Sequence, residues 1–284
     1  MNGGAELPDQ TPLYHAEQAD RYERQRMIAA YQNEFDCRLA IVVDAIFPYG
    51  ITLFEELIYD ADPGMDLHLL LATPGGDGET AVRLVRSAQA RCRALTVIVP
   101  DVAKSAGTLL ALGAHRILMG PTSDLGPVDP QFQLPDGSLV SAKAIIAAVQ
   151  EASKEVQEAP DTYPIHASLL SDVTALMLQQ ARAALARSDD LLEEALRSNP
   201  DRTEDEVATL REALKEPLIG KPKSHDAIFG AREAVAAGLP VVQADPRSSQ
   251  WETVWRLWAK YFALGSRVYE GERASKIMPW PRGA

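Results

Sequence analysis

The sequence predicts an α/β fold built around a mainly parallel sheet. Four short apolar runs, rich in leucine and β-branched residues, are typical of strands buried on both faces; they lie at residues 38–46, 66–74, 94–102 and 115–120. Segments that predict helices separate them, at residues 51–60, 78–91 and 105–114. Because strands that alternate with helices are joined by right-handed crossovers, we expect the four strands to run parallel in one sheet.

The rest of the chain is predicted to surround this core. A helix is expected at 20–34 after an N-terminal arm, and the proline- and glycine-rich residues 121–137 are expected to form a loop. Residues 141–217 predict helices broken at 196–206, and 225–241 predict a turn, a helix with a glycine C-cap and a short strand. We therefore divide the chain into an arm and helix (1–35), a core (36–140), a helical region that returns to the core (141–245) and a tryptophan-rich helix and tail (246–284).

Composition limits the classes of partner. The 284 residues are 46% apolar, enough for a substantial core, and the formal net charge is -12. So acidic a surface repels nucleic acids and anionic lipids, and we expect neither nucleic acid nor a membrane as a partner. The N-terminus lacks the apolar segment of a signal peptide, and no run approaches the ~20 apolar residues of a membrane span. A cytoplasmic protein is therefore expected.

The two cysteines, Cys37 and Cys92, are expected to be reduced thiols in or beside apolar runs. A structural zinc ion needs about four ligands at defined spacings, and the sequence has no matching cluster of cysteines and histidines. We therefore expect no metal and no cofactor.

Two motifs follow predicted strands at points where chemistry is expected. Thr73-Pro74-Gly75-Gly76 ends one strand, and Lys104-Ser105-Ala106-Gly107-Thr108 joins another to a helix. In parallel α/β sheets, functional groups gather outside the carboxyl ends of the strands, and both motifs are expected there.

Ser105 is the candidate nucleophile. A serine that starts a helix is followed by backbone N–H groups without intrahelical acceptors, at the positive end of the helix dipole. The N–H of Ala106 is suited to bind a developing oxyanion, and Gly75 or Gly76 can supply a second donor because glycine permits close backbone approach. The alternative is that Ser105 only caps the helix, as serine commonly does.

Three segments resemble a known family. TPGGDGETAVRLVRSA, VPDVAKSAGTLLALGAHRILMGPTSDLGPVDPQ and SHDAIFGAREAVAAGLPV are similar to the serine dehydrogenase proteinase family, which is related to signal peptide peptidase A and the Clp protease proteolytic subunit; the resemblance spans about residues 38–243. It implies a Clp protease/crotonase-like superhelix of ββα units, with a mainly parallel sheet and appended C-terminal helices. It also implies that Ser105 is the nucleophile and that Gly75, Gly76 and Ala106 stand at the oxyanion hole.

The identity of the general base is open. Clp proteolytic subunits place a histidine after the next strand, but here that loop, residues 126–131, has none. Lys143 is the first candidate, as in the Ser-Lys dyad of signal peptide peptidase A relatives. If Ser141 caps a helix, Lys143 lies in its first turn, where the helix field disfavours the ammonium and favours the neutral amine that a base requires.

Other candidate bases are weaker. His225 falls in a His-Asp pair that resembles a family motif, but a role in a turn or helix cap is the alternative. Lys104 neighbours Ser105 in sequence. Because adjacent side chains leaving a strand point to opposite faces, its amine is not expected to reach the Ser105 hydroxyl. His115 is expected about 15 Å from Ser105, at the far end of the intervening helix.

These observations predict an ATP-independent serine peptidase that cleaves a peptide or protein substrate through an acyl-enzyme. Two alternatives stay open: a crotonase-type acyl-CoA enzyme that uses the same oxyanion hole, and a non-catalytic assembly module with the same fold.

A C-terminal aromatic stripe predicts a homo-oligomer. Trp251, Trp255, Trp258 and Phe262 recur at helical spacing, and so wide an apolar stripe must be covered. Another subunit is the expected cover; the alternative is that the stripe completes the core of its own chain.

Overall fold

A 7-stranded sheet forms the centre of the molecule in the computed structural model, which describes residues 10–134, 137–221 and 227–281. The strand order is β10 (Val241–Gln243), β5 (Arg116–Met119), β3 (Leu95–Val99), β2 (Asp66–Ala72), β1 (Cys37–Val43), β11 (Arg267–Glu270) and β12 (Ser275–Met278). From β10 to β1 neighbouring strands are parallel, whereas β11 is antiparallel to β1 and β12 to β11. The expected α/β class with a mainly parallel sheet is confirmed.

Both faces of this sheet are buried, which explains the continuous apolar runs. In β2, Leu69 and Leu71 belong to the core on one face, and Leu70 and Ala72 belong to the core on the other. Successive side chains of a strand point to opposite faces, so a strand covered on both sides has no polar alternation.

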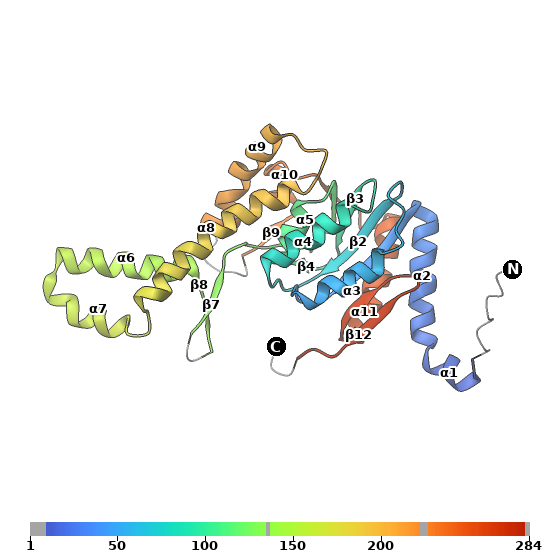
Figure 1. The fold of residues 1–284 in the computed structure, drawn as a ribbon, viewed down its shortest axis with the longest axis horizontal. Helices are drawn as coiled ribbons and strands as arrows, with labels where there is room; N and C mark the ends of the chain where they lie inside the picture. The colour runs from blue at the N-terminus through green and yellow to red at the C-terminus, as the bar shows by residue number, and fades with distance from the viewer. Residues whose placement is uncertain (1–9, 135–136, 222–226, 282–284) are drawn as a thin grey trace.

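Two groups of helices cover the two faces (Figure 1). One face packs against α3 (Tyr49–Ile58), α4 (Gly78–Gln89), α5 (Ala106–Leu112), α10 (Ala231–Ala236), α9 (Glu204–Lys215) and the C-terminal half of α8 (Ala175–Arg197). The other packs against α2 (Ala19–Phe35) and α11 (Ser249–Leu264). A short helix, α1 (Pro12–Glu17), precedes α2, and η2 (Glu216–Gly220) extends α9.

A second, small sheet lies beside the ends of the central strands. It consists of β4 (Val102–Ala103), β6 (Asp124–Leu125) and β9 (Phe229–Gly230); β6 is parallel to β4 and antiparallel to β9. An isolated bridge between Thr73 and Ala103 joins β4 to the segment after β2. The small sheet therefore supports the turn that leads to Ser105.

A lobe projects from the body of the molecule, at the left of Figure 1. It contains the hairpin β7 (Gln131–Gln133) and β8 (Leu139–Ser141), the helices α6 (Ala142–Glu158) and α7 (Tyr163–Leu169), the single 3-10 turn η1 (Pro160–Thr162), and the first part of α8. A small apolar cluster around Ala142, Ile145 and Ala181 holds α6 against α8. Helix α8 runs from this lobe to the body and connects the two (Figure 1).

Residues 121–137 are not a plain loop, and this prediction was wrong. They contain β6 and β7, whose pairing partners lie elsewhere in the chain. Proline, glycine and aspartate mark the turns correctly, but two- and three-residue strands are defined by their partners rather than by local periodicity.

The expected aromatic stripe is divided between core and surface. Trp251 and Trp258 are buried at 5% and 7% exposure, in the core beneath α11, whereas Trp255 and Phe262 are 49% and 72% exposed. Val254, Leu257 and Tyr261 complete the buried face of α11 instead. The four aromatic residues therefore do not form a single stripe, and two of them complete the core of their own chain.

The C-terminal tail adds the antiparallel pair β11 and β12 to the sheet edge, which the sequence did not predict. A buried network attaches it: the Arg24 guanidinium donates to both carboxylate oxygens of Glu270, at 2.8 and 3.2 Å. Tyr261 and Ser275 donate to the same carboxylate, each at 2.7 Å. This network fastens α2, α11 and both tail strands together.

Candidate active site

Ser105 occupies a strained turn between β4 and α5. Its φ is 51° and its ψ is -111°, a conformation that residues other than glycine rarely adopt. Two backbone hydrogen bonds hold the turn: the Thr73 N–H donates to the Val102 carbonyl at 2.9 Å, and the Lys104 N–H donates to the Thr73 carbonyl at 3.1 Å. A sharp strand-to-helix turn of this kind presents a serine hydroxyl away from the backbone.

The Ser105 hydroxyl does not cap α5. It accepts no hydrogen bond from the helix, and among the described residues it has no hydrogen-bond partner. The residue is half-buried. Helix α5 begins at Ala106, so the Ala106 N–H is among the first-turn donors without an intrahelical acceptor. The alternative that Ser105 serves only as a helix cap is therefore excluded by the geometry.

The glycine pair lies directly against this turn. A Cβ atom placed on Gly75 would lie 2.8 Å from the Ser105 Cβ, and one placed on Gly76 would lie 2.2 Å from the Ile46 carbonyl oxygen. Both glycines have positive φ, 115° and 140°. Only glycine fits at these two positions, because they combine a left-handed backbone with close approach of other atoms.

Ile46 also orients the backbone of the glycine pair. Its N–H donates to the Gly75 carbonyl at 2.8 Å, and its carbonyl accepts from the Asp77 N–H at 2.7 Å. Ile46 and Gly76 form an isolated parallel bridge, in which the two neighbours of Gly76 make the hydrogen bonds to Ile46. The N–H of Gly76 therefore points away from Ile46. Among the described residues, the Gly76 N–H thus has no backbone acceptor.

Ser105 and Gly76 share a cavity of ≈ 260 Å³. Its walls come from the loop after β2, the start of α4, helix α5, the segment before β7, and helix α8; they include Leu109, Val128, Asp129, Pro130, Ala184, Arg187, Ser188 and Leu191. No group of three or more histidine, cysteine, aspartate or glutamate side chains among the described residues is arranged to hold a metal ion.

Lys104 points away from the cavity, as its place in the sequence predicts. Its amine forms an ion pair with Asp124 and donates to the carbonyls of Leu125 and Ala227 at 3.3 and 3.2 Å. The side chain passes over Gly126, where a Cβ would lie 2.3 Å from the Lys104 Cδ. Lys104 therefore links the three strands of the small sheet.

Lys143 lies in the first turn of α6, as expected, but makes no hydrogen bond with Ser105. The Ser141 hydroxyl caps the helix by accepting from the Ala144 N–H at 3.2 Å. The Ala142 N–H donates to the carbonyl of Pro130, in the cavity wall, at 2.9 Å. The Lys143 amine itself donates to the Ile219 carbonyl at 3.3 Å. His225 lies outside the described residues.

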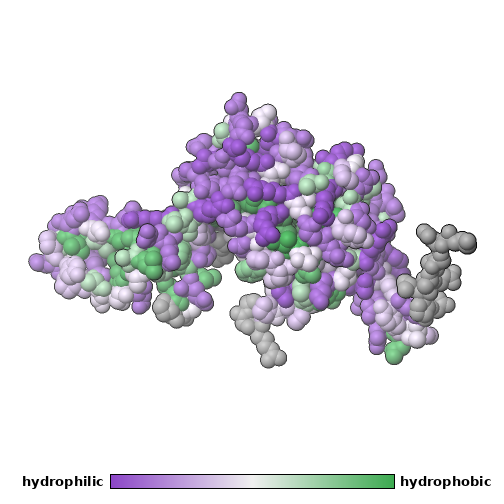
Figure 2. Space-filling model, in the orientation of Figure 1, coloured by the Kyte–Doolittle hydropathy of each residue, from purple (hydrophilic) through white to green (hydrophobic). Residues whose placement is uncertain are grey.

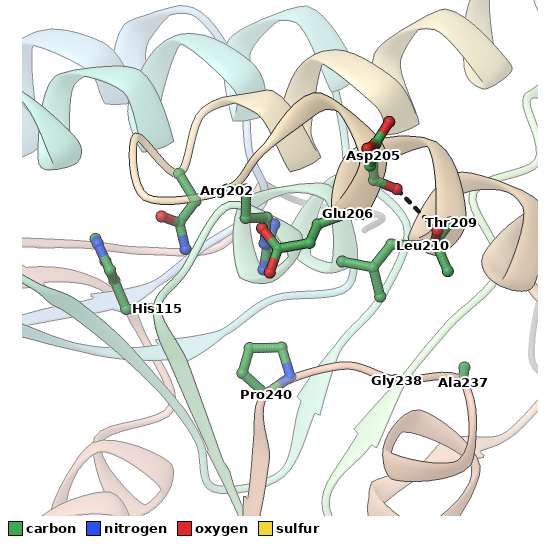
Figure 3. A pocket seen from close by; sticks show the side chains of 10 residues that line it. His115, Arg202, Asp205, Glu206, Thr209, Leu210, Ala237, Gly238 and Pro240 are labelled. Atoms are coloured by element: carbon green, nitrogen blue, oxygen red, sulfur yellow. Dashed lines mark hydrogen bonds between the residues drawn. The ribbon is translucent and has the colours of Figure 1, made fainter.

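A larger cavity, of ≈ 470 Å³, lies at the other end of the sheet beside α9 (Figure 3). His115 lines it, and its Nδ1 accepts from the Leu95 N–H at 3.0 Å. Arg202 donates to the Leu112, Leu196 and Ala114 carbonyls at the ends of α5 and α8. Arg202 in this cavity thus holds helix ends in place. The cavity lies at the amino ends of β5 and β10, away from Ser105.

Sequence reasoning missed the contribution of α8. Arg187, Ser188 and Leu191 line the cavity with Ser105 although they lie more than 80 residues downstream. No local pattern marks them, because they are placed by the packing of α8 against α4 and α5. Asp129, buried at 2% exposure, was marked only by the segment that resembles the family.

Two uncharacterized proteins of Methanocaldococcus jannaschii are similar to this chain. MJ0137 is 43% identical over 77 residues, which cover 27% of each chain. MJ1495 is 26% identical over 183 residues, which cover 64% of this chain and 54% of the relative. The chain thus spans between about a quarter and about half of the length of these curated relatives.

Two solved structures and a family model also match this chain. Two mutants of the 1510-N membrane-bound stomatin-specific protease, one of them in complex with a substrate peptide, match with 27% and 25% identity and a TM-score of 0.32 each. The matches cover 38% of this chain and 55% and 58% of those chains. Among the described residues no helix has the length and apolar character needed to cross a membrane. The model of the ClpP-like SDH-type serine proteinases matches residues 57–242, so the chain belongs to this family.

Proposed function

We propose that this protein is an ATP-independent serine peptidase whose nucleophile is Ser105. The Ser105 Oγ attacks a peptide carbonyl carbon and transfers its proton to a base, which then protonates the leaving amine as the peptide bond breaks. Water hydrolyses the resulting ester and regenerates the hydroxyl. The observation that carries the proposal is the strained Ser105 turn against the glycine pair, with a hydroxyl that does not cap α5 and has no hydrogen-bond partner among the described residues.

The backbone supports an oxyanion hole at the same place. We assign its donors to the N–H groups of Gly76 and Ala106, with Gly75 setting the backbone path. Such donors bind the oxygen most strongly when it carries negative charge in the transition state. The loss of one donor typically costs about 2.7–4 kcal/mol of transition-state stabilisation.

Lys143 is our candidate for the base. Its helix is anchored to the cavity wall one residue away, through the hydrogen bond from Ala142 to Pro130. The residue before its carbonyl acceptor, Leu218, accepts from the Val128 N–H at 2.9 Å, and Val128 lines the cavity. The proposal requires the flexible lysine side chain to rotate from the Ile219 carbonyl toward Ser105 when substrate binds. His225 is the next candidate, and Lys104 follows it because its amine already has three acceptors.

We also propose that the chain self-associates through its lobe. Figure 2 shows apolar residues on the lobe, and Tyr163, Ile165 and Leu169 of α7 are 64%, 61% and 74% exposed. Surfaces of this kind on a soluble domain commonly mark an interface. Sedimentation equilibrium decides the point, since a single species near the chain mass of 30.9 kDa would refute self-association.

Hydrolysis of a peptide ester tests the proposed function. Ser105→Ala should abolish turnover with little loss of stability, because the hydroxyl makes no hydrogen bond with any residue that the structure describes. Lys143→Ala should also inactivate, whereas Lys104→Ala should retain more activity. Lys154→Ala is the matched control, since Lys154 lies on the same helix with its side chain 75% exposed. Equal turnover by the wild type and Ser105→Ala would end the proposal.

A further inference from the structure

Ser188 lies on the inner face of α8, facing the cavity of Ser105. Ala181, Ala184, Ser188 and Leu191 recur at the spacing of one helix face, and all but Ser188 are apolar. Ser188 is only 6% exposed, and it lines the same cavity as Ser105. A polar side chain thus interrupts an apolar face at the point where that face meets the candidate active site.

Apart from Ser105, the other polar side chains of this cavity have partners. The Asp77 carboxylate caps α4 by accepting a hydrogen bond from the Thr80 N–H in the first turn of that helix. Glu79 pairs with Arg187 through two hydrogen bonds of 2.6 and 2.7 Å. Asp129 accepts from Gln131 at 3.4 Å and has a further interaction. These groups are therefore already committed to contacts within the chain.

The Ser188 hydroxyl, by contrast, has no hydrogen-bond partner among the described residues. The Ser188 oxygen is not one of the fully buried polar atoms that lack a partner, so it opens onto the cavity. A substrate bound at Ser105 would enter this space, and a hydroxyl that loses water there without gaining a hydrogen-bond partner is unfavourable.

We propose that Ser188 hydrogen-bonds the side chain of the substrate residue whose carbonyl is attacked, and so selects a small hydroxyl-bearing residue, serine or threonine, at that position. This inference rests on the proposed peptidase function. Leu109, Val128 and Leu191 supply the apolar part of the wall. The cavity volume of ≈ 260 Å³ lies below the range of roughly 300–1,000 Å³ that is usual for larger ligands, so the cavity suits a single substrate side chain.

Matched peptide esters test the inference. Two substrates differ only at the residue before the scissile bond, where one carries serine and the other 2-aminobutyrate, which replaces the hydroxyl by a methyl group. The wild type should prefer the serine ester by about 3- to 10-fold in kcat/KM, the range expected for one neutral hydrogen bond. Ser188→Ala should lower that ratio to about 1 by slowing the serine ester only, and Ser188→Thr should restore the preference.

A control variant and the comparison of the two esters distinguish a failure of the inference about Ser188 from a failure of the proposed function. In Ser198→Ala the lost hydroxyl belongs to the C-cap residue of the same helix and donates to the Glu194 carbonyl at 2.8 Å, away from the cavity, so the preference should be unchanged. Alanine favours helix, which makes misfolding of Ser188→Ala unexpected. If neither ester is hydrolysed by the wild type, the proposed function itself fails. If both are hydrolysed without preference, or if Ser188→Ala keeps the preference, only the inference about Ser188 is overturned.

Discussion

Single residues at the candidate active site hold backbone conformations that are costly elsewhere. Ser105 and Gly76 have φ angles of 51° and 140°, and hydrogen bonds from Thr73 and Ile46 hold them there. For Ser105, which is not a glycine, strain of this kind costs about 1–3 kcal/mol and persists only where the surrounding structure enforces it. Glycine adopts a positive φ without that cost, which is why Gly76 can stand where it does. Both residues face one cavity, so the strained backbone is concentrated where the proposed chemistry needs fixed donors and an exposed hydroxyl.

Gly76→Ala should therefore destroy activity. A Cβ at this position would meet the Ile46 carbonyl, so the backbone must shift and the Gly76 N–H must leave its place. Loss of one oxyanion donor lowers kcat by about 100- to 1,000-fold. Gly265→Ala is the control, because Gly265 also has a positive φ, 58°, but no atom lies within 4 Å of the added Cβ. Turnover by Gly76→Ala at the wild-type rate would contradict the assignment.

The residues of the two motifs were predictable from sequence, and those of α8 were not. Ser105, Gly75, Gly76 and Ala106 belong to short strand-to-helix turns whose chemistry can be read locally. Ser188 looks like an ordinary polar residue on a helix, and only the packing of α8 shows that it faces inward.

At the scale of elements, a buried contact joins α2 to β2. The Tyr31 hydroxyl and the His68 Nδ1 lie 2.8 Å apart, and both side chains are buried, at 1% and 7% exposure. Burial of His68 lowers its pKa to about 4, against a small opposing effect of the Asp66 carboxylate. The folded chain thus holds this imidazole neutral.

Because burial lowers the pKa of His68, the free energy of unfolding should fall as the pH falls. The unfolded pKa of His68 is near 6.5 and the folded value is lower, so between these two values the unfolded state binds more protons. The contribution is complete above about pH 6.5 and is lost on acidification toward pH 4. Between pH 7 and pH 5 the free energy of unfolding should fall by about 2 kcal/mol more in the wild type than in His68→Gln.

Urea unfolding of both proteins at the two pH values measures this difference. Other titrating groups contribute equally to both, so the comparison isolates His68. The same loss of stability in the wild type and in His68→Gln would show that His68 does not carry the effect.

Elements with strong periodicity were predictable, and elements defined by their partners were not. The core strand β2 and the helix α4 begin at or close to the expected residues, because apolar runs and helical spacing mark them. The strands β6 and β9 have two residues each and exist only through their pairing. The strands β11 and β12 lie in the tail after α11, where the sequence has no clear strand pattern. Their place is set by contacts such as that between Arg24 and Glu270.

On the scale of the whole molecule, the candidate site depends on segments from distant parts of the chain. The core brings the glycine pair and Ser105 to the carboxyl ends of adjacent strands, as parallel α/β topology requires. Helix α8 then crosses from the lobe to the body and closes one wall of the cavity (Figure 1). The candidate nucleophile thus belongs to the core, whereas the shape of the cavity depends on the assembled chain.

Labelling with a fluorophosphonate tests the central claim, that Ser105 is an activated nucleophile, most directly. The reagent phosphonylates serine hydroxyls that are activated beside an oxyanion hole. We expect a single adduct on the wild type, mapped to Ser105 by mass spectrometry of its peptides, and none on Ser105→Ala. It also separates a peptidase from a crotonase-type enzyme or an assembly module, neither of which needs a reactive serine here. Folded wild-type protein that remains unlabelled, or is labelled at another serine, would contradict the account.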